Sequence, residues 1–120
     1  MDLEISPAVA VYIDMSKSDT EYQVLKIFEK HPDWTQRQIA AELGLSLGKA
    51  NYVIRALIDK GLIKLSNFKR SDKKLGYIYL LTPVGITEKS RLAQNFLKRK
   101  SKEYNRLKKE IEILKEELNQ

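Results

Sequence analysis

The strongest constraint on the fold is a pair of short amphipathic helical patterns, TQRQIAAELGLSLGKANYVIRALIDKGLI, between Thr35 and Ile63. The first pattern is about nine residues long, below the length at which an isolated helix is stable in water. It therefore has to be held by packing, and the second pattern, only a few residues further on, is the nearest partner. The segment predicts two helices in contact across a tight turn.

The first of these helices carries signals at both ends. Thr35 with Gln38 forms a capping box, and Trp34 with Ile39 has the spacing of a hydrophobic staple. Gly44 follows the last apolar position, where a helix commonly ends in a residue with positive φ. We expect a helix from Thr35 to Gly44.

The second helix is predicted to start after Ser46 as N-cap, to run to about Lys60 and to stop at Gly61. One broad face is apolar: Ala50, Val53, Ile54, Leu57 and Ile58. The opposite side carries a polar stripe: Gly48, Tyr52, Arg55 and Asp59, flanked by Lys49 and Asn51. A short capped helix, a tight turn and a second helix with a free polar face predict a helix-turn-helix.

An earlier helix is predicted from Ser18 to Lys30, opened by a capping box between Ser18 and Glu21 and ended by His31-Pro32. Its apolar stripe is Tyr22, Leu25, Ile27 and Phe28. Residues 1–17 show no helical pattern, since Pro7 interrupts them. They are interpreted as an N-terminal arm or extension, loosely ordered or packed on a dimer partner.

A β-hairpin is predicted after the second helix of the pair. Residues 62–68 and 76–81 are rich in β-branched and aromatic residues, and they bracket a basic loop, residues 69–75. A hairpin at this place is the wing of a winged helix-turn-helix.

The rest of the chain predicts one long helix. Thr82-Pro83 supplies an N-cap and an N1 proline, and nothing interrupts the pattern up to Leu118. Its second half fits a heptad with Lys100 as the exception: Leu97, Tyr104, Leu107, Ile111, Leu114 and Leu118. The fold class is thus mainly α with a small β-hairpin, a winged helix-turn-helix followed by a long C-terminal helix forming a coiled coil.

Charges beside this seam predict how two copies pair. In the heptad frame Glu103 and Glu110 take g positions, while Lys108 and Lys115 take the e positions that follow them. A parallel homodimer matches each Glu with a Lys of the other chain, whereas an antiparallel pair sets like charges together. We expect a parallel homodimer with residues 96–120 as its dimerisation helix.

Composition and charge narrow the function. The chain has no cysteine, which excludes disulfides and thiolate sites, and no apolar run long enough for a membrane span. The net charge is +6, but residues 1–34 hold three Lys against seven acidic residues, while residues 60–74 hold six basic residues against Asp72. We expect a cytoplasmic protein that binds a polyanion through its middle segment.

The polar face of the second helix is therefore interpreted as a major-groove surface for double-stranded DNA. The predicted contacts are Ser46, Gly48, Lys49, Asn51, Tyr52 and Arg55 from this helix and Lys69, Arg70, Lys73 and Lys74 from the wing. Gln36 and Arg37 are placed to touch the DNA backbone, with solvated surface as the alternative. Both features also have an explanation without DNA. The polar face can be the solvated side of an amphipathic helix, and the basic loop can be a charged hairpin tip that prevents edge pairing.

These segments resemble a known family. TQRQIAAELGLSLGKANYVIRALIDKGLIKL, the basic hairpin and YLLTPVGITEK are similar to the MarR-type transcriptional regulators, and most to the branch associated with exopolysaccharide genes. The resemblance covers about residues 18–118 and implies a dimeric bacterial regulator, with a DNA-binding domain at 18–95. It implies recognition by residues 46–55 and a wing at 69–74.

Other classes of function have less support. The only histidine, His31, precedes a proline at a helix end and is interpreted as a surface residue, and no phosphate loop, metal spacing or nucleophile with its base is present. The sequence predicts no enzyme and no cofactor, and it identifies no effector. The alternative is a winged-helix protein-interaction module that docks through its coiled coil.

Overall fold

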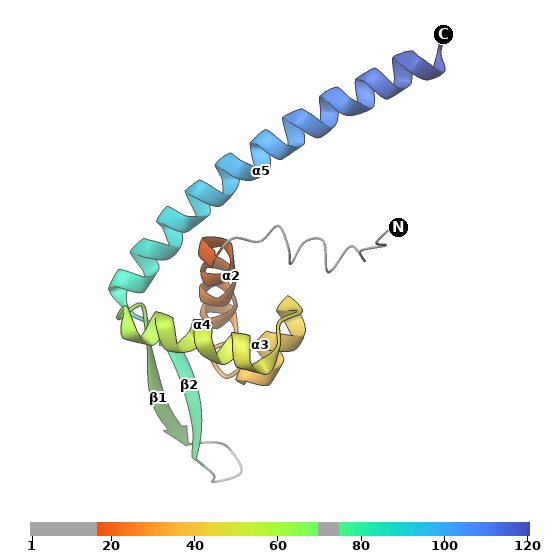
Figure 1. Cartoon of the computed structure of the whole chain (residues 1–120). Coiled ribbons are helices and arrows are strands. Elements are labelled where there is room, and N and C mark those ends of the chain that lie inside the picture. The colour runs from red at the N-terminus through yellow and green to blue at the C-terminus, as the bar shows by residue number, and fades with distance from the viewer. Residues whose placement is uncertain (1–16, 70–74) are drawn as a thin grey trace.

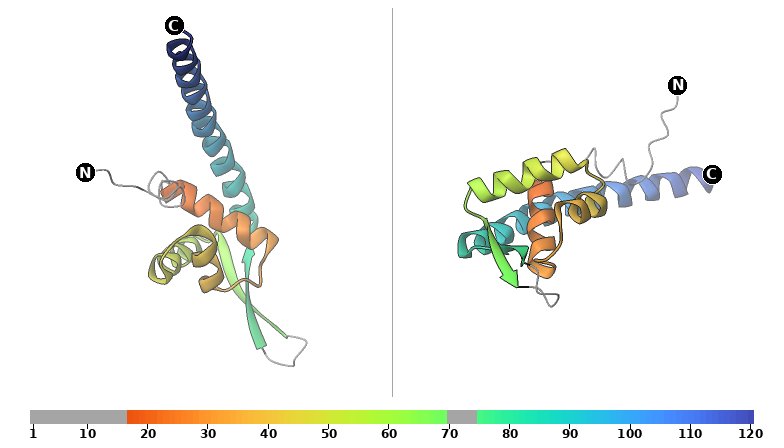
Figure 2. Two further views of the ribbon diagram at one scale, coloured as in Figure 1. Left: turned by 90° about the vertical axis from the view of Figure 1, so that its right-hand side faces the viewer. Right: turned by 90° about the horizontal axis from the view of Figure 1, so that it is seen from below.

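A computed structural model describes residues 17–69 and 75–120 of the chain (Figure 1). The order of elements is α2 (Lys17–Lys30), α3 (Gln36–Leu43), α4 (Leu47–Asp59), β1 (Ile63–Lys69), β2 (Leu75–Leu81) and α5 (Pro83–Leu118). Helices α2, α3 and α4 pack together, the hairpin projects from them, and α5 leaves the domain as a rod (Figures 1 and 2). The predicted fold class, mainly α with a small β-hairpin, a winged helix-turn-helix and a long C-terminal helix, is confirmed, and the coiled coil stays a prediction. The predicted arm lies outside the described residues, apart from Lys17.

The core draws on every helix and on the start of the hairpin. Its buried members are Val24, Leu25, Phe28, Ile39, Val53, Ile54, Leu57, Leu62, Ile63 and Leu92. Four of the five apolar positions predicted on α4 are buried, but Ile58 is 36% exposed. Ile58 is rotated by about 100° from Leu57, which takes the core-facing position in the last turn of the helix.

The predicted ends of α3 and α4 are confirmed. The Thr35 hydroxyl accepts from the Gln38 backbone N–H (3.2 Å), and the Thr35 N–H donates to the Gln38 side chain (2.7 Å). Gly44 has φ of 68° and Gly61 has φ of 73°, so both chain reversals use the left-handed region that glycine enters without strain. The Ser46 hydroxyl accepts from the Lys49 N–H at 3.0 Å. These local bonds fix where each short helix begins.

The predicted start of the first helix is wrong. Ser18 lies inside α2, which already includes Lys17, and the Glu21 carboxylate pairs with the Lys60 ammonium at 2.7 Å. A lysine at the end of α4 thus uses the carboxylate that the capping box assigned to the helix start. This ion pair joins α2 to α4.

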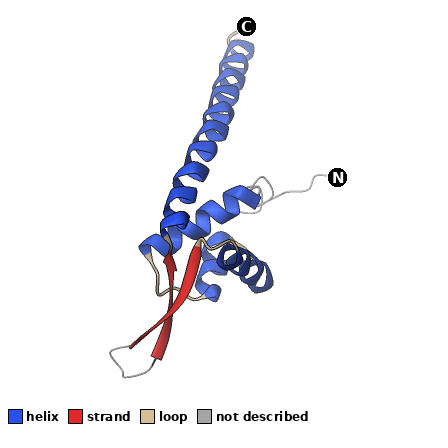
Figure 3. Ribbon diagram, turned by 90° about the vertical axis from the view of Figure 1, so that its left-hand side faces the viewer, coloured by secondary structure: helices blue, strands red, loops and turns tan. Residues whose placement is uncertain are grey.

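The hairpin is antiparallel, with Ile63 opposite Leu81 and Lys69 opposite Leu75 (Figure 3). Strand β1 is shifted by one residue at both ends from the predicted 62–68, and β2 begins one residue before the predicted 76–81. The hairpin is fixed to the loop between α2 and α3, because the Tyr79 N–H donates to the Pro32 carbonyl (2.9 Å). The Tyr79 ring also stacks on Phe28, with 4.6 Å between ring centroids.

Helix α5 begins and ends as predicted, with Thr82 as N-cap and Pro83 in its first turn. Its first half packs on α2: Tyr22 contacts Phe96 at 5.4 Å between centroids, Lys89 pairs with Glu29 at 2.6 Å, and Arg99 pairs with the nearly buried Asp19. From residue 101 onward every side chain is exposed, so this part of α5 extends beyond the domain (Figure 2). Among the described helices, none combines the length and the apolar character needed to cross a bilayer.

Candidate nucleic-acid interface

The outward face of α4 is open to solvent over its whole length. Leu47 is 42% and Tyr52 58% exposed, and Lys49 and Arg55 are also exposed. Helix α4 and the hairpin lie on the side of the domain away from the free end of α5 (Figures 1 and 2). A duplex could therefore meet the helix and the wing together without meeting the rod.

The first turn of α4 is accessible down to its backbone. A Cβ added at Gly48 would meet nothing within 4 Å, so this glycine leaves a gap in the side-chain surface. The free N–H groups and the dipole of a helix N-terminus favour anionic groups. Leu47, which the sequence analysis did not single out, is exposed beside them. An exposed aliphatic group of this kind can contact a thymine methyl.

Cationic groups follow along the same stripe. The Lys49 ammonium lies 5.5 Å from the centroid of the Tyr52 ring, close enough for a cation–π contact that orders both side chains. Arg55 lies one turn further on and has no ion-pair partner within residues 17–69 and 75–120. Its guanidinium is available for the bidentate contact that guanine or phosphate accepts.

Two predicted contact residues, Gln36 and Asn51, are hydrogen-bonded to each other, and their contact with DNA stays a prediction. The Asn51 side-chain amide donates to the Gln36 side-chain oxygen (2.9 Å), and the Gln36 amide donates to the Tyr79 hydroxyl (3.3 Å). Both hydrogen bonds are partly buried, whereas Arg37, the next residue of α3, is exposed. Tyr79 was not identified by the sequence analysis, because nothing in the strand pattern indicates that its hydroxyl faces α3.

The basic wing tip is described only at its margins. Lys69 ends β1 and its side chain is not described, while Arg70, Lys73 and Lys74 lie outside the described residues. Their contact with DNA remains a prediction. On the described part of the hairpin, Asn67 and Tyr77 stand opposite each other and are exposed. They add a polar and an aromatic group that the sequence analysis did not single out.

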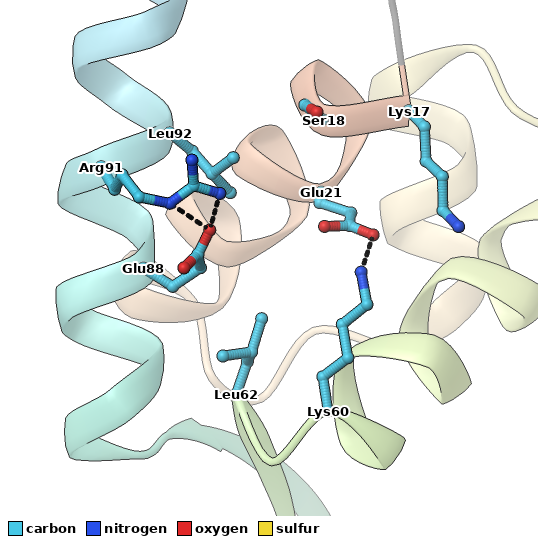
Figure 4. Close-up of a pocket in the computed structure, with 8 residues that line it drawn as sticks. All are labelled: Lys17, Ser18, Glu21, Lys60, Leu62, Glu88, Arg91 and Leu92. Carbon is cyan, nitrogen blue, oxygen red and sulfur yellow. Dashed lines mark hydrogen bonds and ion pairs between the residues drawn. The ribbon is translucent and has the colours of Figure 1, made fainter.

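A cavity of about 400 Å³ lies on another side of the domain, between α2, the end of α4 and the start of α5 (Figure 4). Its walls carry the Glu21–Lys60 and Glu88–Arg91 ion pairs. The hydrogen bond from Arg91 holds the pKa of Glu88 below its usual value. The Glu21–Lys60 pair joins α2 to the end of α4, and the Glu88–Arg91 pair lies within α5. The described residues gather no group of three potential metal ligands.

The predicted dimerisation residues form an exposed stripe along α5 from Leu97 to its end. Their exposed fractions range from 44 to 85%: Leu97, Tyr104, Leu107, Ile111, Leu114 and Leu118. Apolar side chains repeating at heptad spacing on a free helix are the surface that a coiled-coil partner covers.

Residues 17–64 match the family model described as winged helix-turn-helix DNA-binding. The match covers α2, α3, α4 and the start of β1, which are the elements that carry the open face described above. Among curated proteins, no sequence matches this chain.

Solved structures with the same fold include a repressor and two proteins named as MarR or MarR/EmrR regulators. The adhesin competence repressor of Streptococcus pyogenes has a TM-score of 0.56 and 19% identity, over 92% of this chain and 83% of its own. A MarR/EmrR family regulator from Acinetobacter sp. ADP1 has a TM-score of 0.55 and 22% identity, over 81% of this chain and 66% of its own. Staphylococcus aureus MarR, solved in complex with salicylate and kanamycin, has a TM-score of 0.54 and 18% identity, over 83% of this chain and 63% of its own. The chain spans just under two thirds of the latter two proteins, and the likeness establishes the fold.

Proposed function

We propose that this protein is a sequence-specific, DNA-binding transcriptional regulator that acts in the bacterial cytoplasm as a homodimer. The observation that carries the proposal is the open face of α4, with Lys49, Tyr52 and Arg55 presented beside a hairpin. The match to winged helix-turn-helix DNA-binding domains supports the same conclusion. The connection with exopolysaccharide genes rests on the resemblance of sequence segments alone.

The exposed groups have distinct roles in this proposal. Arg55 and Lys49 donate to guanine edges in the major groove, and Leu47 and Tyr52 contact thymine methyl groups or the sugar–phosphate backbone. The first turn around Gly48, together with Arg37, contacts phosphates. The wing, residues 69–74, lies on the backbone or in the minor groove.

The test is selection of duplexes from a random-sequence pool, followed by fluorescence anisotropy on the enriched duplex and on a scrambled one at two salt concentrations. We expect tighter binding to the enriched duplex that persists at the higher salt. Arg55→Ala should weaken binding to the enriched duplex by about 1–3 kcal/mol and change binding to the scrambled duplex little. Arg37→Ala, the matched control, should weaken both alike.

Equal binding to both duplexes that salt abolishes would contradict the proposal. It would leave a basic surface and favour the alternative, a protein-interaction module that docks through α5. If Arg55→Ala weakened binding to both duplexes equally, Arg55 would be a phosphate contact and the base-recognition role would be wrong.

We further propose that the homodimer is a parallel coiled coil of residues 96–120. The exposed heptad stripe supports a second copy as the partner, because an uncovered apolar seam of this length is unfavourable in water. Arg99, which pairs with Asp19, projects from a different side of α5 than Leu97, so docking on α2 and pairing along the seam are compatible. The alternation of Glu103, Lys108, Glu110 and Lys115 favours the parallel direction.

Charge exchange tests both partner and direction. Glu103→Lys should weaken the dimer, because it faces Lys108 of the other copy, and adding Lys108→Glu should restore it. The measurement is the dimer dissociation constant by sedimentation equilibrium. In an antiparallel dimer Glu103→Lys would strengthen association at once, and that result would refute the parallel arrangement. A monomer at all concentrations would refute the homodimer.

A further inference from the structure

The hydrogen-bonded chain of Asn51, Gln36 and Tyr79 joins three separate elements at the base of the candidate interface. It links α4, whose outer face is the proposed recognition surface, to α3 and to β2 of the wing. We propose that Gln36 is a positioning residue that fixes the recognition helix relative to the wing and thereby determines sequence discrimination. This inference rests on the DNA-binding function proposed above.

The backbone from which the Gln36 side chain extends is fixed. It is the first residue of α3 and follows Thr35, whose capping box fixes the backbone at this point. From there its side-chain oxygen accepts from Asn51 and its amide donates to Tyr79. Because both ends of the Gln36 amide are engaged, the side chain acts as a spacer of defined length between α4 and the wing.

Tyr79 provides a rigid endpoint on the wing. Its ring stacks on Phe28, one of the least exposed residues of the core, and its backbone N–H bonds to the Pro32 carbonyl. Across the hairpin it lies opposite Leu65. With ring and backbone both fixed, the hydroxyl cannot move without disturbing the core. The wing is therefore fixed, through Tyr79, to the same core on which α4 packs.

The hydrogen bond between Asn51 and Gln36 restrains the part of α4 that carries the proposed recognition surface. Asn51 lies between Ala50, which is buried, and Tyr52, which is exposed, so its side chain leaves the helix at the border of the two faces. Holding this border restricts rotation of α4 about its own axis. Such rotation would displace Arg55 from a base edge, and base recognition depends on position far more than phosphate attraction does.

The proposal predicts a specific pattern of losses. Tyr79→Phe removes one hydroxyl and keeps the stacked ring, and Gln36→Ala removes the spacer. Tyr79→Phe should lower the ratio of affinities for the enriched and scrambled duplexes by about three- to tenfold, the range expected for one net hydrogen bond. Gln36→Ala breaks two hydrogen bonds and should lower this ratio at least as much. The double variant should be no worse than Gln36→Ala, because both changes break one chain. The salt dependence should not change.

Two further variants separate positioning from direct contact. Gln36→Glu keeps an acceptor for Asn51 and can accept from the Tyr79 hydroxyl, so it should retain the wild-type affinity ratio. If Gln36 touched a phosphate, the added charge would weaken binding to every duplex and change the salt slope. Tyr22→Phe is the matched control, because it removes a hydroxyl from another half-buried ring that packs on a phenylalanine, Phe96. It should leave the ratio unchanged.

The inference is overturned if Tyr79→Phe retains the full affinity ratio, or if Gln36→Glu abolishes binding to all duplexes. Either result would make Gln36 a DNA contact or a bystander while the regulator function stands. Absence of discrimination by the wild-type protein would instead refute the proposed function, and this inference with it. Thermal unfolding of each variant shows whether a changed ratio merely follows lost stability.

Discussion

Gly85→Ala should destabilise the fold although it improves a helix. Gly85 lies in the first turn of α5, and a Cβ built there would lie 1.9 Å from the Leu62 carbonyl oxygen and 2.9 Å from the carbonyl carbon. Both are backbone atoms, so no rotamer change relieves the clash. The first turn of α5 must move by about 1.5 Å before the methyl reaches 3.4 Å, where ordinary contact begins.

Opposing terms decide the outcome. Alanine gains about 1 kcal/mol over glycine inside a helix. Overpacking costs about 1–3 kcal/mol, and the shift strains the hydrogen bond from the Thr82 N–H to the Leu62 carbonyl (3.0 Å). Such a bond contributes about 1 kcal/mol. We expect a net destabilisation of about 1–3 kcal/mol, since the gain from alanine offsets the loss of this bond.

The assay is urea unfolding followed by circular dichroism, with all proteins at one concentration because a dimer's stability depends on it. With a slope of about 2 kcal/mol per molar urea, the midpoint should fall by about 0.5–1.5 M. Gly48→Ala is the matched control, since its Cβ meets nothing within 4 Å and α4 should gain stability. A midpoint for Gly85→Ala that equals or exceeds the wild-type value would refute the close approach of α5 to Leu62.

Two further predictions concern other parts of the molecule. Gly48→Ala should weaken DNA binding by about 1 kcal/mol, roughly fivefold, because the methyl group separates the first turn of α4 from the phosphates. The fold should be no less stable than in the wild-type protein. Unchanged affinity in the anisotropy titration would argue against a contact between this backbone and DNA. Glu88→Gln should lower the urea midpoint at neutral pH. In acid, the midpoints of the variant and of the wild-type protein should no longer differ. Arg91 holds the folded pKa of Glu88 below 4.5, so the pair's contribution is present above that value and is lost as the pH falls through the folded pKa. An equal difference at about pH 7 and pH 3 would contradict this explanation.

The junction between the winged helix-turn-helix and the rod is built from α2. Its acidic side chains Asp19, Glu21 and Glu29 pair with Arg99 and Lys89 of α5 and with Lys60 at the end of α4. The rod therefore leaves the domain at an angle that α2 helps to fix. In a parallel dimer that angle sets how far apart the recognition helices lie, and so the spacing of the half-sites.

Much of the fold was predictable because its signals are local. The capping box at Thr35, the glycines at 44 and 61, the cap at Ser46 and the Thr82-Pro83 start act within one turn of chain, and each was confirmed. The core face of α4 followed from periodicity, except at Ile58, where the last turn left a predicted core residue at the edge. The exposed cations of α4 followed from the same periodicity.

Contacts between distant segments were decided by the tertiary structure. Glu21 lies three residues after Ser18, yet its carboxylate pairs with Lys60 from another helix. Gln36 and Asn51 have side chains suited to DNA, yet they bond to each other and to Tyr79, 43 residues from Gln36. The closeness of Gly85 to Leu62 likewise depends on how α5 meets the hairpin. Sequence specifies which side chains can bond, but only packing decides which of several competent partners comes within reach.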